Sequence, residues 1–127
     1  AGSTSAFANG QITDEECNDS VLDAIGWYCG NADYSLQEVA QLIPNSWGLY
    51  DMHGNIWEWC NDLSSGDYVG DETDPVGVVE GVFANRRCRG SGYDRDSALC
   101  RSARRLYASQ DSSFYSIGFR FVRSTGL

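Results

Sequence analysis

Residues 44–62 read PNSWGLYDMHGNIWEWCND, a stretch rich in tryptophan, glycine and acidic residues. Two carboxylates within it, Asp51 and Glu58, stand on either side of Gly54. A glycine turn between them can aim main-chain carbonyls inward, and oxygen ligands of this kind suit a hard cation such as Ca²⁺. The other interpretation is that both carboxylates bind nearby backbone or pair with arginines. The stretch predicts an ordered, loop-rich fold with a candidate calcium cage.

Aromatic residues dominate the same stretch. Trp47, Trp57 and Trp59 are expected to pack in the core rather than to form a ligand-stacking surface. If residues 56–60 form a strand, Trp57 and Trp59 point away from Glu58, because successive side chains of a strand face opposite sides. His53 has no partner cysteine or serine motif, so we expect it on the surface or in a supporting position behind the cage.

Charge is divided unevenly along the chain. Residues 1–85 carry fifteen carboxylates and no base, whereas residues 86–127 carry nine arginines and three aspartates, and the net charge is −9. We expect the arginines to pair with carboxylates inside one domain that spans residues 1–127. An acidic chain is repelled by phosphate backbones, so nucleic-acid binding is not expected. No apolar run approaches the roughly 18 residues that span a membrane, and the N-terminus lacks the pattern of a signal peptide.

Cysteine usage favours an oxidising compartment. Cys17, Cys29, Cys60, Cys88 and Cys100 include no CxxC pair, and one histidine accompanies them, which does not fit a zinc site of familiar spacing. We expect one or two disulfides and a leftover thiol, with the pairing undetermined. This favours an extracellular, cell-surface or virion-surface location. The alternative is a cytosolic protein with reduced, buried thiols.

Regular secondary structure is expected to be short. Residues 18–27 are the best helix candidate, with Asn18 or Ser20 as its cap. Fourteen glycines, together with many Asn, Asp and Ser residues, predict long ordered loops. The strand candidates are residues 56–60, 78–84, 87–90 and 118–123. In the last of these, Phe119 and Phe121 would share one face.

The chain contains a series of short motifs that resemble, in their residues and their order, the formylglycine-generating-enzyme (sulfatase-modifying-factor) type domain, a variant of the C-type lectin fold. The resemblance is carried by residues 44–62 and continues through Thr73-Asp74-Pro75, Arg89-Gly90, Cys100-Arg101-Ser102-Ala103 and Gly118-Phe119-Arg120. It implies an α+β fold with little regular secondary structure, a small twisted antiparallel sheet and long ordered loops. The upstream part of the usual family domain is expected to be missing. Calcium-binding family members use side chains matching Asp51 and Glu58 and carbonyls matching Gly54 and Ile56.

Catalysis is not expected from the positions that the resemblance assigns to it. Oxidases of the family hold copper between two thiolates that lie five residues apart, after an Arg-Gly-Gly-Ser motif, and soft thiolates are what Cu(I) requires. Here Arg89-Gly90-Ser91-Gly92 stands for that motif, which places Arg95 at the first thiolate and Cys100 at the second. We therefore expect no copper and no catalytic residues. The related iron-dependent branch needs three histidines, and the chain has one.

A recognition surface is expected nearer the C-terminus. Tyrosine and arginine give large contact area and directional hydrogen bonds at low entropic cost. The predicted contact surface consists of Tyr93, Asp94, Arg95, Asp96, Arg104, Leu106, Tyr107, Phe114 and Tyr115.

This region also resembles the variable part of proteins diversified by diversity-generating retroelements. Adenine mutation of Asn codons cannot produce Lys, Glu, Gln, Met or Trp, and none of these occurs at positions 93–99, 104–109 or 112–117. Ordinary drift in a non-catalytic relative is the other explanation.

The resemblance as a whole implies a non-catalytic domain that binds a protein or glycan ligand as a monomer or weak oligomer. The alternatives are a divergent oxidase or accessory subunit, and a partner domain whose upstream half is on another chain.

Overall fold

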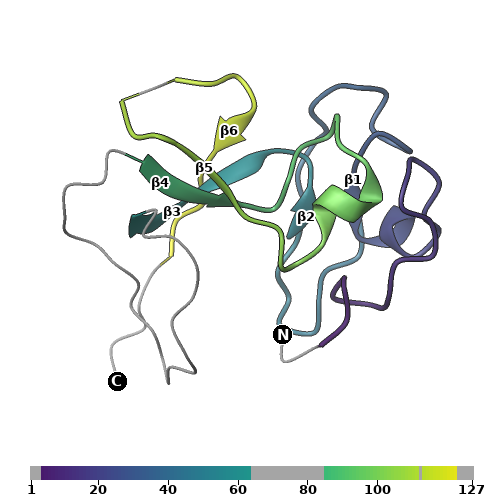
Figure 1. The fold of residues 1–127 in the computed structure, drawn as a ribbon. Helices are drawn as coiled ribbons and strands as arrows, with labels where there is room; N and C mark the ends of the chain where they lie inside the picture. The colour runs from purple at the N-terminus through teal and green to yellow at the C-terminus, as the bar shows by residue number, and fades with distance from the viewer. Residues whose placement is uncertain (1–3, 64–84, 112, 123–127) are drawn as a thin grey trace, which may run out of the picture.

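The computed structural model describes residues 4–63, 85–111 and 113–122, which form short elements joined by long loops (Figure 1). The 3₁₀ helices are η1 (Leu22–Ala24) and η2 (Ser97–Cys100), and the strands are β1 (Gly26–Trp27), β2 (His53–Gly54), β3 (Trp57–Leu63), β4 (Asn85–Arg89), β5 (Leu106–Ser109) and β6 (Ile117–Gly118). This is the α+β, C-type-lectin-like architecture with little regular structure that the sequence predicts. The strand predicted at residues 78–84 lies outside the described residues.

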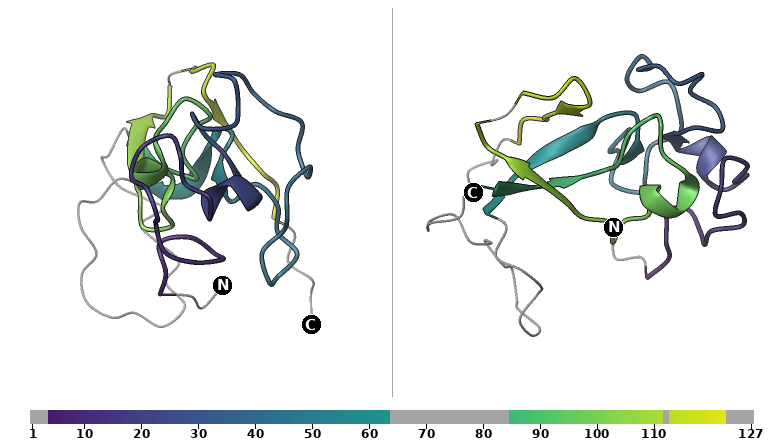
Figure 2. Two further views of the ribbon diagram at one scale, coloured as in Figure 1. Left: turned by 90° about the vertical axis from the view of Figure 1, so that its right-hand side faces the viewer. Right: turned by 45° about the horizontal axis from the view of Figure 1, so that its top comes forward.

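Four strands form the main sheet, in the order β5-β4-β3-β6. Neighbours β5, β4 and β3 are antiparallel, as expected, whereas β6 pairs with β3 in parallel, with Trp57 opposite Ile117. Figure 2 shows the twist of this sheet from two further sides. The prediction for residues 118–123 was too long, because the ladder ends at Gly118 and the following backbone through 122 is irregular. Strand β5 was not predicted.

Strands β1 and β2 form a separate two-stranded parallel pair in which the backbones approach closely. Gly54 has a φ of +79°, and a Cβ atom there would lie 1.9 Å from the carbonyl oxygen of Trp27. A Cβ atom on Gly26 would lie 2.5 Å from the carbonyl oxygen of His53. The glycine at the centre of residues 44–62 is therefore required by this contact between two strands.

The segment predicted as a helix is largely a turn. Only residues 22–24 are helical, as a 3₁₀ turn, and neither Asn18 nor Ser20 caps it. The buried carboxylate of Asp19 binds four backbone N–H groups instead, namely those of Thr13, Asp14, Val21 and Leu22, at 2.7–3.0 Å. Burial opposes ionisation of this carboxyl, but the four hydrogen bonds outweigh it and lower the pKa of Asp19. The helix prediction failed because Asp19 satisfies backbone donors on both of its sides.

The apolar core lies between the N-terminal loops, η1, β1 and η2. Its buried members are Phe7, Leu22, Ile25, Tyr28 and Cys100. The expectation that three tryptophans pack inside holds for Trp57, which is 5% exposed, and is wrong for Trp47, which is 69% exposed. Trp47 is exposed because Asn45 folds its loop into a tight turn, accepting hydrogen bonds from the N–H groups of Trp47 and Leu49. Trp59 is half-buried in β3.

One disulfide joins Cys17 to Cys29, with 5.3 Å between their Cα atoms. It ties the N-terminal loops to the end of β1. This confirms the lower of the two expected numbers of disulfides, and it leaves Cys60, Cys88 and Cys100 as free thiols rather than a single one. Within residues 4–63, 85–111 and 113–122, no helix has the length and apolar character needed to span a bilayer.

Candidate ligand-binding site

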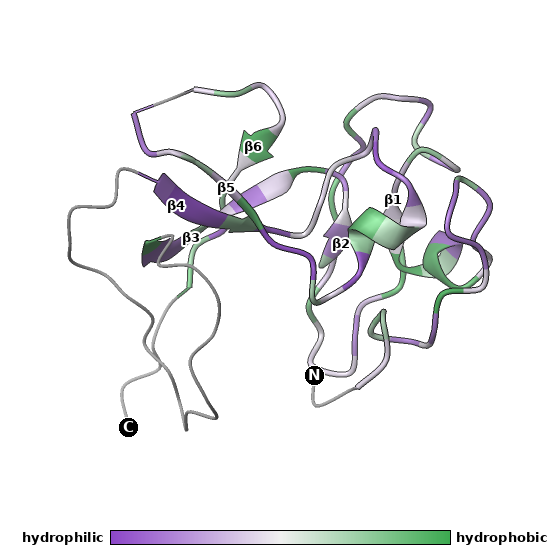
Figure 3. Cartoon of the chain, in the orientation of Figure 1, coloured by the Kyte–Doolittle hydropathy of each residue, from purple (hydrophilic) through white to green (hydrophobic). Residues whose placement is uncertain are grey.

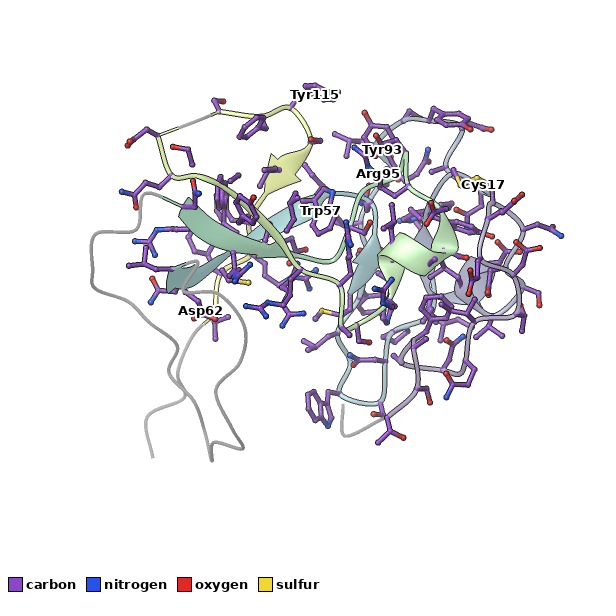
Figure 4. All side chains as sticks on the ribbon, viewed as in Figure 1. Cys17, Trp57, Asp62, Tyr93, Arg95 and Tyr115 are labelled. Carbon is purple, nitrogen blue, oxygen red and sulfur yellow. A yellow bond between two sulfur atoms is a disulfide. The ribbon has the colours of Figure 1, made fainter. Side chains whose placement is uncertain are left out.

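Two loops that carry predicted contact residues are anchored to the same short segment. The N–H of Tyr93 donates to the carbonyl of Asn55 at 2.9 Å, and the N–H of Trp57 donates to the carbonyl of Ser116 at 3.1 Å. The loop before η2 is therefore anchored at Asn55 and the loop before β6 at Trp57, two residues further along the chain. Figure 4 shows Tyr93 and Arg95 on one loop and Tyr115 on the other, along the upper side of the view.

Three aromatic side chains of the predicted surface are exposed. Tyr115 is 83% exposed and Phe114 is 45% exposed, on the loop between β5 and β6. Tyr107 is 60% exposed on β5, which forms the opposite edge of the sheet from β6. The predicted surface thus has one part around Tyr93 and Tyr115 and a second part at the β5 edge.

The charged residues of the predicted surface differ in their exposure and in the contacts that they make with the scaffold. Arg95 is exposed and pairs with Asp94, with 3.3 Å between Nε and Oδ1. Asp96 is committed to the scaffold, since its carboxylate accepts the N–H of Leu99 at the start of η2. Arg104 is half-buried, and its Nε has no hydrogen-bond partner among the described residues. Leu106 is half-buried at the first position of β5.

The candidate calcium cage is partly occupied by an arginine. Both carboxylate oxygens of Glu58 bind the guanidinium of Arg120, which also donates to the carbonyls of Tyr50 at 3.0 Å and Asp51 at 3.2 Å. The pairing of a carboxylate with an arginine, one of the two interpretations of the sequence, is what the structure has at Glu58. The hydrogen bond to Glu58 raises the pKa of Arg120.

The two carboxylate oxygens of Asp51 differ in their hydrogen bonding. One carboxylate oxygen accepts the N–H of Ala40 at 2.8 Å, and the other, Oδ1, is buried with no hydrogen-bond partner among the described residues. A buried oxygen in that state is stabilised by a nearby positive charge. Gly54 lies in β2, and Ile56 joins it to β3. No group of three or more His, Cys, Asp or Glu side chains suited to a metal occurs in the described ranges. The predicted four-ligand cage is therefore incomplete in this structure, because Arg120 holds the carboxylate of Glu58.

The two positions that the resemblance assigns to copper do not form a thiolate pair. Cys100 is 1% exposed, and burial raises the pKa of its thiol to about 12. Arg95, at the other position, is an exposed cation paired with Asp94. One position thus holds a protonated, buried thiol and the other a guanidinium. The pair does not supply the two soft anionic ligands that Cu(I) needs. The residues present do not fit that metal.

His53 is buried, which corrects the expectation of a surface position. Its side chain is 3% exposed and stacks edge-on against Phe7, with 5.5 Å between the ring centroids. Nε2 accepts the N–H of Ala8 at 3.1 Å, and Nδ1 lies 2.9 Å from the carbonyl oxygen of Cys100. Because an amide donates and a carbonyl accepts, the imidazole is the neutral tautomer protonated on Nδ1. It joins the N-terminal segment to η2 beneath the loop of Tyr93 and Arg95.

Comparison with known proteins places this geometry in a family. The sulfatase-modifying factor enzyme 1-like domain matches residues 4–125. The formylglycine-generating enzyme of Streptomyces coelicolor is 37% identical over 98 residues, covering 73% of this chain and 31% of that protein.

Two solved structures are also similar. Treponema denticola variable protein 1 superposes with a TM-score of 0.71 and 28% identity, covering 90% of this chain and 41% of that one. PvdO from Pseudomonas aeruginosa gives a TM-score of 0.73 and 26% identity, covering 87% and 43%. The chain spans less than half the length of each of these proteins. The chain belongs to the family of sulfatase-modifying factor enzyme 1-like domains.

Proposed function

We propose that this chain is a non-catalytic recognition domain that binds a protein or glycan ligand through its predicted contact surface. The observation that carries the proposal is the exposure of three aromatic side chains among the predicted contact residues, Tyr107, Phe114 and Tyr115. Large rigid side chains with few rotatable bonds lose little entropy on binding. The likeness to Treponema denticola variable protein 1 supports a diversified ligand-binding surface on this fold.

The absence of a copper thiolate pair supports a non-catalytic role. Arg95 and Cys100 occupy the positions at which the family's oxidases need two reactive thiolates, and Cys100 is buried. A divergent oxidase or an accessory subunit is the competing function, because relatives include formylglycine-generating enzymes. Conversion of a sulfatase-type cysteine peptide to its aldehyde by the purified protein with Cu(I) would establish that competing function.

Binding is tested on protein and glycan arrays with the wild type and two variants. Tyr115→Ala with Tyr107→Ala removes exposed aromatic area from the proposed surface, and Trp47→Ala removes an aromatic side chain of similar exposure from a different loop. We expect the double variant to lose at least tenfold in affinity for any captured ligand and the Trp47 variant to bind as the wild type does. Equal binding by all three proteins would refute the proposed surface.

A calcium ion at Asp51 is proposed as a stabiliser of the scaffold. The support is the buried Oδ1 atom, which has no hydrogen-bond partner among the described residues. The ion would supply positive charge to that oxygen and no chemistry to a ligand. We expect CaCl₂ to raise the melting temperature of chelator-treated wild type and to have a smaller effect on Asp51→Asn. An unchanged melting temperature in the wild type would remove calcium from the proposal.

The disulfide between Cys17 and Cys29 supports placement on the outside of a cell or virion. Recovery of this bridge by mass spectrometry from protein made in its natural host, without added oxidant, tests that location. Both cysteines reduced in that material would favour the cytosolic alternative.

A further inference from the structure

We propose that a second binding site, separate from the predicted contact surface, takes a small ligand through an oxyanion group, a phosphate, sulfate or carboxylate. The site is a cavity of about 570 Å³ beside the N-terminal segment. Ligand pockets for small molecules are commonly about 300–1,000 Å³. The cavity is lined by Thr4, Ser5, Ala6, Gln11, Arg89, Arg101, Ser102 and Ala103.

Hydrogen bonds hold the cavity walls together. The N–H of Ser102 donates to the carbonyl of Ala6 at 2.8 Å, and the N–H of Ala6 donates to the side chain of Gln11 at 3.3 Å. Arg89 donates from Nη1 to the carbonyls of Ser102 and Arg104 at 3.1 and 3.2 Å. The N-terminal segment, the loop after η2 and the end of β4 are thus connected to one another, and the cavity exists before any ligand enters.

Among the described residues, the charged lining of the cavity is cationic, because Arg89 and Arg101 line it and no carboxylate does. This contrasts with a chain whose net charge is −9. An oxyanion is attracted to a cavity that two guanidinium groups line. The hydroxyls of Thr4, Ser5 and Ser102 add neutral donors that can complete the coordination of an oxyanion.

Arg101 is the residue best suited to meet the ligand. A guanidinium has five N–H donors in a planar fork, and the described contact of Arg101 uses Nη1, which donates to the carbonyl of Ala98. That contact orients the side chain. It does not use Nε and Nη2, the paired donors that can bind two oxygens at once. Carboxylates, phosphates and sulfates share this geometry of acceptor oxygens, which is why the three are named together.

The surroundings extend the positive potential. Strand β4 reads NRRCR, and Figure 3 shows it as mostly hydrophilic. Side chains at 87 and 89 share a face of β4, because alternate residues of a strand point to the same side. Arg87 lies opposite Tyr107 on β5. A row of cations that leads to the cavity raises the local concentration of anions and speeds their association.

The experiment titrates sodium phosphate, sulfate and acetate into isotopically labelled protein at constant ionic strength, with sodium chloride as the reference. We expect saturable amide shifts centred on Ala6, Ser102 and Ala103 with at least one oxyanion and none with chloride. Acetate separates a carboxylate preference from a preference for tetrahedral anions. Amide shifts of the wild type that do not saturate, or that centre on other residues, overturn the proposed site without any variant.

Variants then test the role of Arg101. Arg101→Gln should weaken the oxyanion at least tenfold, and Arg101→Lys should recover charge but not the fork, giving intermediate binding. Arg86→Gln is the matched control, since it removes one arginine charge outside both the cavity and the predicted contact surface. An Arg101→Gln protein that binds as tightly as Arg86→Gln overturns the assignment. These outcomes are independent of the array experiment, because neither result requires the aromatic surface to bind anything.

Discussion

The guanidinium of Arg120 forms a two-point ion pair with the carboxylate of Glu58, which precedes it by 62 residues. The same guanidinium donates to the carbonyls of Tyr50 and Asp51, so one side chain ties the C-terminal segment to β3 and to the loop before β2. The pair is partly shielded from water, with 35% and 19% of the two side chains exposed. It therefore contributes more than a typical surface pair.

Substituting either partner should lower the free energy of unfolding. We expect Arg120→Gln and Glu58→Gln each to cost about 1–2 kcal/mol. The double variant should be less destabilised than the sum of the two, because the second substitution removes a group that has already lost its partner. Urea denaturation of the four proteins measures this coupling. Strictly additive losses would show that the two residues stabilise the fold independently.

Gly54 should not tolerate a side chain. A Cβ atom at this position would lie 1.9 Å from the carbonyl oxygen of Trp27, and the φ of +79° strains any L-residue. Gly48 is a matched control, with a φ of +75° and open space around it. We expect Gly48→Ala to cost about 1 kcal/mol, the strain alone, and Gly54→Ala to cost more than about 3 kcal/mol or to prevent folding. Circular dichroism melts that are equal for both variants would contradict the close packing of β1 against β2.

Stability should fall as the solution is acidified below about pH 6.5. Burial lowers the pKa of His53, opposed by its hydrogen bond to the carbonyl of Cys100. The unfolded chain then binds a proton in a range where the folded chain does not, so stability is lost from the unfolded pKa down to the folded one. Protonation in the fold would also break the bond from the N–H of Ala8 to Nε2.

The slope within that window should not exceed about 1.4 kcal/mol per pH unit, the limit for one proton. His53 is the sole histidine of the chain, so His53→Gln should flatten the stability profile between pH 5 and 7. A flat wild-type profile in chemical denaturation over this range would mean that the imidazole titrates alike in the folded and unfolded states.

The three free thiols should differ in reactivity. Cys60 is half-buried, whereas Cys88 and Cys100 are buried. Burial raises the pKa of Cys88 to about 11 and that of Cys100 to about 12, so neither supplies a thiolate near neutral pH. With an aromatic disulfide reagent at pH 8, we expect one thiol to react in the native protein and three after unfolding. Cys60→Ser should abolish the native reaction, and rapid labelling of Cys88 or Cys100 in that variant would contradict the described packing.

The family and the outline of the fold were predictable because they depend on local patterns. Residues 56–60 place Glu58 between Trp57 and Trp59, an alternation with the period of a strand, and β3 begins at Trp57 within this range. Residues 87–90 likewise overlap β4. Strand β5 could not be predicted from the sequence, because Leu106–Ser109 has no clear alternation of apolar and polar residues. Its strand conformation depends on pairing with β4.

The candidate site was harder to predict, because its chemistry depends on residues distant in sequence. Nothing local to Glu58 indicates that Arg120 will reach it, and nothing near His53 indicates that Ala8 and Cys100 will bury it. Trp47 appeared to be a core residue by type alone, and the turn at Asn45 exposes it. The cavity at Arg89 and Arg101 joins segments some ninety residues apart in the chain, which no spacing rule could bring together.

Strand β6 has a consequence for how the protein is made. The central strand β3 is flanked on one side by β4, the next strand along the chain, and on the other by β6, which comes after both β4 and β5. A nascent chain on the ribosome cannot close this side of the sheet, nor pair Glu58 with Arg120, until residues 117–120 have left the exit tunnel. Until then, the edge of β3 that pairs with β6 is open to other strands.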